Sequence, residues 1–83
     1  MFMDEIKKII KRMVEKPQNV RFVDACRVCK YYFGEARIKG SHCIYKTPWQ
    51  GDPRINIQND RGKAKAYQVR QLLKAISKIK GEQ

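Results

Sequence analysis

Apolar residues in this 83-residue chain repeat at two different periods, and the order of the periods limits what the chain can fold into. Three stretches carry apolar residues three and four positions apart, which is the spacing of an amphipathic helix. They predict helices over about residues 3–16, from residues 19–22 to residue 33, and over about residues 66–80. Between the second and third of these stretches, apolar and polar residues alternate instead, as they do in half-buried strands.

The alternating region divides into three short predicted strands. Residues 35–39 form the first, which we expect to be half-buried, and a Gly40-Ser41 turn joins it to a second strand over residues 42–46. The third covers residues 54–58. The order of helix, helix, three strands and helix predicts one α+β domain over residues 1–83, with a three-stranded antiparallel sheet and its helices on one face.

The net charge of +11 is far from neutral and points to a polyanionic partner, because Lys and Arg that neutralise phosphates release condensed counterions. Nucleic acid is therefore expected, in preference to a membrane surface or a merely solvated surface. No apolar run approaches the roughly 20 residues of a membrane span, and the N-terminus does not read as a signal peptide. With three cysteines, an odd number that suits reduced thiols, we expect a cytoplasmic protein.

Alternation leaves two orientations for the strand that begins at His42, the only histidine of the chain. Either Cys43 and Tyr45 face the core, or the histidine does. We expect the first arrangement, which places His42 on the open face of the sheet beside Arg37 and Lys39.

The pair Cys26-x-x-Cys29 lies on the apolar face of the second predicted helix, where a free cysteine packs as a small hydrophobe. A metal site completed by His42 and Cys43 is the alternative. Because adjacent strand residues point to opposite faces, these two are poorly placed to bind one ion together with a helix face. We expect no metal and no cofactor.

Basic residues continue into the last helix, since residues 61–80 contain seven Lys or Arg and no acid. Lys63 and Lys65 precede that helix, whose N-terminal amides favour an anion, and they form a candidate phosphate clamp. Trp49, in the connection between the second and third strands, is expected to pack over the sheet edge, with stacking on a base as the alternative. The candidate RNA-binding residues are Arg37, Lys39, Ser41, Lys46, Lys63, Lys65 and Arg70.

Gly40-Ser41-His42, followed by Ile44-Tyr45, resembles the G-S-H signature of the HicA toxin family. Residues 62–73 resemble the segment that leads into the last helix of that family, and residues 19–22 are similar to a longer subgroup. The resemblance covers about residues 19–79.

This resemblance implies a double-stranded-RNA-binding-like fold and the toxin role in a type II toxin–antitoxin system. The implied activity is that of a metal-independent mRNA interferase, an endoribonuclease, which a HicB-type antitoxin binds and blocks. The family's catalytic histidine corresponds to His42, and histidine titrates near neutral pH, as a general acid or base requires. Many members carry a second histidine where this chain has Cys43, so no role is carried over for that position. A non-catalytic double-stranded RNA-binding module and a small DNA-binding regulator are the alternative functions.

Overall fold

A computed structural model describes residues 2–81, which fold into three helices and one antiparallel sheet. The sheet has four strands in the order β1-β2-β3-β4, so the α+β class is confirmed and the predicted number of three strands is wrong. All three predicted helices are present within two residues of their expected ends. The elements are α1 (Phe2–Glu15), α2 (Phe22–Phe33), β1 (Arg37–Lys39), β2 (His42–Lys46), β3 (Arg54–Asp60), β4 (Lys63–Ala64) and α3 (Ala66–Ile79).

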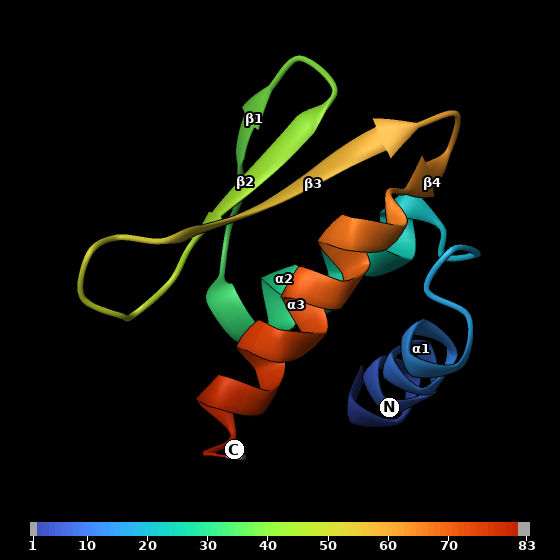
Figure 1. Cartoon of the computed structure of the whole chain (residues 1–83), viewed down its shortest axis with the longest axis horizontal. Coiled ribbons are helices and arrows are strands. Elements are labelled where there is room, and N and C mark those ends of the chain that lie inside the picture. Colours follow the sequence, from blue (N-terminus) through green and yellow to red (C-terminus); the bar gives the residue numbers. More distant parts are fainter. Residues whose placement is uncertain (1, 82–83) are drawn as a thin grey trace.

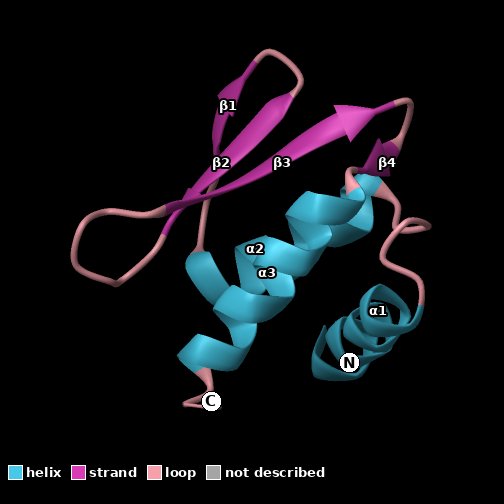
Figure 2. Ribbon diagram, viewed as in Figure 1, coloured by secondary structure: helices cyan, strands magenta, loops and turns pink. Residues whose placement is uncertain are grey.

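The helices lie on one side of the sheet (Figure 1). α2 and α3 pack against the sheet and against each other, and α1 packs against both of them, seen nearly end-on while α3 runs diagonally across the view. Figure 2 shows the same division, with the cyan helices grouped below the magenta strands. Among residues 2–81, no helix is both long enough and apolar enough to cross a membrane.

The core fills the space between the sheet and the helices. On the sheet side it is formed by alternate residues of β2 and β3. Tyr45, Ile55 and Ile57 are all at most 8% exposed, and each lies on the sheet face toward α2 and α3. Met13 brings α1 into the same core. The largest fully buried side chains are those of Met13, Ile57, Leu72, Val20, Val28, Val69 and Cys29.

β4 was not predicted because it has only two residues, too few for an alternating pattern. It forms because Arg61 and Gly62 both adopt positive φ, of 56° and 86°, the backbone of a type I′ hairpin loop that folds the chain back on β3. On its other side, the Ala64 amide donates to the Val20 carbonyl oxygen at 2.9 Å. Backbone hydrogen bonds on both sides therefore define this strand. Because such bonds depend little on side-chain type, the sequence pattern does not predict them.

β1 is shorter than expected and is not half-buried. The strand covers only Arg37–Lys39, and Ile38 is 74% exposed. Ile38 is paired with Cys43 and so lies on the sheet face that carries the core, but β1 is an outer strand of the sheet. The expected burial of this strand is wrong because the helix layer does not cover Ile38.

Candidate active site on the open face of the sheet

The open face is the sheet surface that points away from α2 and α3, and strand register assigns its residues. Cys43 and Tyr45 lie on the covered face, with Tyr45 3% exposed, so the expected orientation of β2 is confirmed. His42 is therefore on the open face, directly opposite Lys39 of β1 and Gln58 of β3.

The side chain of His42 is held by a neighbour from β3. Nδ1 of His42 and Oδ1 of Asn56 are 2.8 Å apart, and both residues are half-buried. Asn56 is the cross-strand partner of Ile44, so the contact runs diagonally between the two strands. Within residues 2–81, Nε2 of His42 makes no hydrogen bond.

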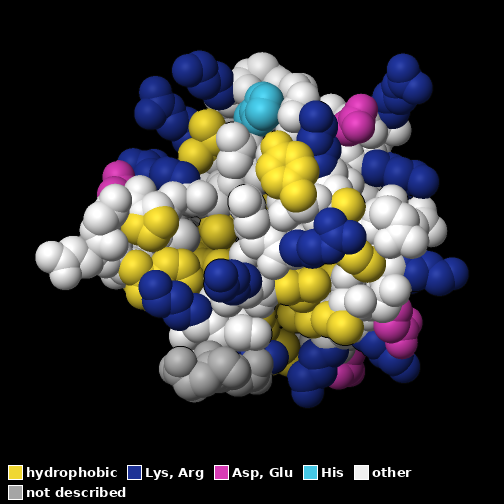
Figure 3. Space-filling view, viewed as in Figure 1, with side chains coloured by type: hydrophobic (Ala, Val, Ile, Leu, Met, Phe, Trp, Pro, Cys, Tyr) yellow, Lys and Arg dark blue, Asp and Glu magenta, His cyan; other side chains and the backbone are white. Residues whose placement is uncertain are grey.

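Cations dominate the open face around this pair. Arg37 lies opposite Ile44, and Lys46 lies opposite Arg54, so both are on the same face as His42 but farther along β2. Residues 37–46 and 54–58 contain no acid. Figure 3 shows the single histidine, in cyan, at the surface among dark blue Lys and Arg side chains. β3 ends in Asp60, which alternation places on the same face as Asn56 and Gln58, but Lys and Arg outnumber the acids here, so this part of the face attracts an anion.

An acidic residue lies at the margin of this face. Asp52, in the loop before β3, accepts a hydrogen bond from Arg54 at 2.8 Å. That hydrogen bond lowers the pKa of the exposed Asp52 carboxyl. The carboxylate therefore neutralises part of the charge of Arg54.

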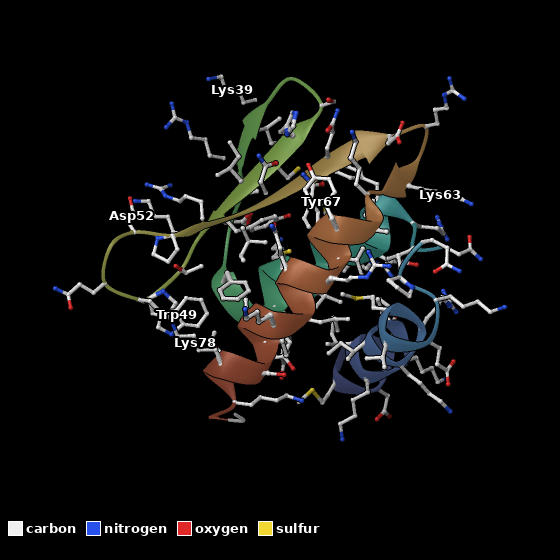
Figure 4. The ribbon with its side chains drawn as sticks, viewed as in Figure 1. Lys39, Trp49, Asp52, Lys63, Tyr67 and Lys78 are labelled. Carbon is white, nitrogen blue, oxygen red and sulfur yellow. The ribbon has the colours of Figure 1, made fainter. Side chains whose placement is uncertain are left out.

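The remaining candidate RNA-binding residues are distributed around this face. Ser41 lies in the turn before β2, and its carbonyl oxygen accepts from the Asn59 amide at 2.8 Å, which fixes the start of the strand that carries His42. Lys63 is exposed on β4 at the opposite end of the sheet from Lys39 (Figure 4). Lys65 is the residue before α3, without a side-chain cap to the helix, and Arg70 is exposed on α3. The structure therefore places Lys39 beside His42, puts Arg37 and Lys46 farther along the same face, and leaves Lys63 apart.

α3 is nevertheless tied to the strand opposite His42. Gln68, which is 3% exposed in the first turn of α3, accepts a hydrogen bond through Oε1 from the Gln58 amide at 2.7 Å. Its Nε2 donates to the hydroxyl of Tyr67 at 3.4 Å, and the Tyr67 ring is 54% exposed. The basic segment before α3 is thus anchored beside β3.

Sequence reasoning missed Asn56 and Gln68. Alternation placed Asn56 on the polar side of its strand, but its partner depends on the register between β2 and β3. That register depends on the conformation of the loop over residues 47–53. The sequence of this loop does not specify which residues of β2 and β3 pair. Gln68 was missed because helix propensity indicates only that glutamine suits a helix. It does not indicate that the side chain bonds to a neighbouring strand.

The cysteines lie on the other face of the sheet, among apolar groups. All three are free, and Cys29 is fully buried. Burial raises the pKa of Cys26 to about 11, and it also raises the pKa of Cys29 and of Tyr45. Within residues 2–81, no group of three or more His, Cys, Asp or Glu side chains is placed to hold a metal ion. His42 and Cys43 lie on opposite faces, as strand geometry requires.

Trp49 packs against the ends of two helices. Its ring is 6.1 Å from that of Phe33 in an edge-to-face arrangement, and the Lys78 ammonium lies 4.4 Å from its centroid (Figure 4). The expected packing role is confirmed, although the contacts are with α2 and α3 rather than with the sheet edge. Trp49 is therefore half-buried and packed against the core cluster.

Compared with protein-family models, with curated proteins and with solved structures, the chain shows no match.

Proposed function

We propose that this chain is a metal-independent endoribonuclease that cuts mRNA, with His42 as the catalytic acid or base. The observation that carries the proposal is the setting of His42, the one imidazole of the chain, on a basic face beside Lys39 and away from the core. The hydrogen bond of His42 is to a neutral amide, and the surrounding charges favour a phosphate.

The reaction we propose is transfer within the RNA. A base removes the proton of a 2′-hydroxyl, the 2′-oxygen attacks the adjacent phosphorus, and the bond from phosphorus to the 5′-oxygen of the next nucleotide breaks. That oxygen takes up a proton, so the products are a 2′,3′-cyclic phosphate and a 5′-hydroxyl. Histidine suits either proton transfer because it titrates near neutral pH. We assign the other transfer to water, because the chain has one histidine and no second proton-transfer group is paired directly with it across the strands except Lys39, which binds phosphate in this proposal.

The basic residues hold the RNA backbone in this proposal. Lys39, directly opposite His42, binds the scissile phosphate, and Arg37 and Lys46 contact its neighbours along the sheet. Lys63 and Lys65 bind more distant phosphates near the start of α3, together with Arg70 and Ser41. Such contacts are independent of sequence, so they bind and orient RNA without selecting a base.

The resemblance to HicA toxins supports the same reaction. The segment from α2 to α3 has the helix, three strands and helix that a double-stranded-RNA-binding-like fold requires, with β4 as a two-residue addition. We propose that the chain is the toxin of a type II toxin–antitoxin system that acts on mRNA in the cytoplasm. A HicB-type antitoxin would cover the open face, and complementary charge would speed its association. Failure of the chain to bind such an antitoxin encoded beside it would count against this partner.

The test is cleavage of a long single-stranded RNA in EDTA by the parent and by His42→Ala, after circular dichroism shows that both are folded. We expect the parent to cut the RNA to 2′,3′-cyclic phosphate ends and the variant to be slower by about 100-fold to 10,000-fold, the usual contribution of a general acid or base. Equal cleavage by both would reject His42 as the catalytic residue. If neither cuts but both bind RNA, the chain is a non-catalytic binding module, and tighter binding to duplex DNA would instead favour a regulator.

A further inference from the structure

On the basis of the function proposed above, we propose that Asn56 is a positioning residue that holds His42 in the tautomer with the proton on Nδ1. Nε2 is then the nitrogen that exchanges a proton with RNA. The observation is the 2.8 Å contact between Nδ1 of His42 and Oδ1 of Asn56.

The contact is held by the sheet on both sides. His42 and Asn56 lie on neighbouring strands joined at five register positions, from His42 opposite Gln58 to Lys46 opposite Arg54. The turn before His42 is bonded to β3, and Gln68 holds the Gln58 amide from α3. Neither side chain therefore depends on a mobile loop for its position. Both are half-buried, which strengthens a hydrogen bond relative to one in water.

The chemistry of the two atoms selects the tautomer. A carbonyl oxygen only accepts, so Nδ1 must carry the proton for the contact to be a hydrogen bond. In the other neutral tautomer, the lone pair of Nδ1 would face the lone pairs of the Asn56 oxygen at the same short distance. The hydrogen bond of one ring nitrogen therefore sets the protonation of the other.

The same hydrogen bond survives the proton transfer. Nδ1 carries a proton both in the favoured neutral ring and in the imidazolium, so a proton can arrive at or leave Nε2 while the bond to Asn56 stays in place. No reorganisation of the ring is needed, which is the advantage of a preorganised site. Because Asn56 is neutral, it orients the ring without adding a negative charge that would repel phosphate.

The chain has one histidine, so nitrogen NMR reports this tautomer without ambiguity. At a pH where titration shows the ring to be neutral, long-range ¹H–¹⁵N correlation should show a protonated Nδ1 and an unprotonated Nε2 in the parent. Asn56→Leu keeps the size of the side chain but cannot accept, and it should move the population toward the Nε2–H form. Asn56→Asp retains an acceptor and should keep the parent tautomer.

Gln58→Leu is the matched control, because Gln58 is a carboxamide on the same strand and face, directly opposite His42. It should leave the tautomer unchanged. A parent ring protonated on Nε2, or equal populations in the parent and Asn56→Leu, would overturn the proposal.

Kinetics separate this role from the proposed function. Asn56→Leu should lower kcat by roughly 10-fold to 100-fold with KM retained, an effect on the order of that of other partners that orient a reacting histidine. Asn56→Asp should recover most of the loss in kcat but raise KM, because its negative charge repels phosphate. If Asn56→Leu changes the tautomer but keeps kcat, Asn56 has no part in catalysis. If the parent shows the expected tautomer and does not cut RNA, the proposed function fails while the control of His42 by Asn56 stands.

Discussion

The two faces of the sheet are built from the same strands, yet they have opposite properties. On β3, Ile55 and Ile57 are buried against the helices, while Asn56 between them meets His42 on the open face. On β2, Tyr45 is buried, and its neighbour Lys46 is exposed. Adjacent residues of one strand therefore point to opposite faces, one into the core and the next toward the candidate site. Substitutions on one face should therefore change the stability of the fold, and substitutions on the other should change the candidate site.

The largest difference is expected when adjacent residues of β3 are each cut back to alanine. Ile57→Ala should lower the free energy of unfolding by about 2–5 kcal/mol, because it leaves a cavity at a fully buried position. Asn56→Ala should lower it by about 1 kcal/mol, the net value of one hydrogen bond. Urea denaturation followed by circular dichroism measures both. Similar losses for the two variants would mean that the open face also stabilises the fold.

High pH should weaken the packing of the covered face. Burial raises the pKa of Cys26 from 9.0 to about 11, so between these values the thiol ionises in the unfolded chain but not in the folded one. Its contribution to stability is complete below pH 9.0 and is lost as the pH rises through about 11. Cys29 and Tyr45, whose pKa values are also raised, act in the same direction.

The measurement is the free energy of unfolding of the parent and of Cys26→Ala as a function of pH. Lysine titration is common to both proteins and cancels in the comparison. The variant should lose less stability than the parent as the pH rises past 9.0. Parallel profiles would show that the Cys26 thiol ionises equally in both states.

On the open face, Lys39→Ala should weaken RNA binding and leave stability unchanged. Removing one phosphate contact should reduce the slope of log affinity against log salt by about 0.7 for single-stranded RNA. Lys8→Ala removes the same charge from an exposed position on α1 and is the control. Filter binding at several salt concentrations distinguishes them. An equal change in both slopes would mean that the total charge, and not the open face, binds RNA.

The smallest effect is expected at the Trp49 contact. Lys78→Ala removes the ammonium that lies 4.4 Å from the ring centroid and should cost about 0.5–1 kcal/mol of stability, with RNA cleavage unchanged. Lys74→Ala, on the same helix and also exposed, should cost less. Thermal unfolding of the two variants measures the difference. Equal melting temperatures would show that the cation adds nothing to the packing of Trp49.

Periodicity was sufficient for the parts of the fold that depend on a single element. The helices and the inward direction of Tyr45 follow from the spacing of apolar residues alone. The spacing of apolar residues was insufficient for features that depend on how two elements pack against each other. Ile38 alternates like a buried residue, but its exposure depends on how far the helix layer extends over the sheet.

The candidate site divides in the same way. The position of His42 on the open face could be predicted, because it needs only the direction of one strand. Its contact with Asn56 could not, because register across residues 47–53 decides which side chains of β3 reach it. β4 was missed for a related reason, since its two residues are held by backbone hydrogen bonds to segments distant in sequence.

The hydrogen bond from the Gln58 amide to Gln68 also bears on self-association. β4 pairs only with Asn59 and Asp60, so the preceding residues of β3 have no strand on that side. A row of unpaired backbone groups at a sheet edge is a template for the strand of another molecule. The buried Gln68 carboxamide occupies one of these groups at 2.7 Å and blocks the addition of a strand there. The edge of β3 beside α3 is thus protected at Gln58 from pairing with a second copy of the chain.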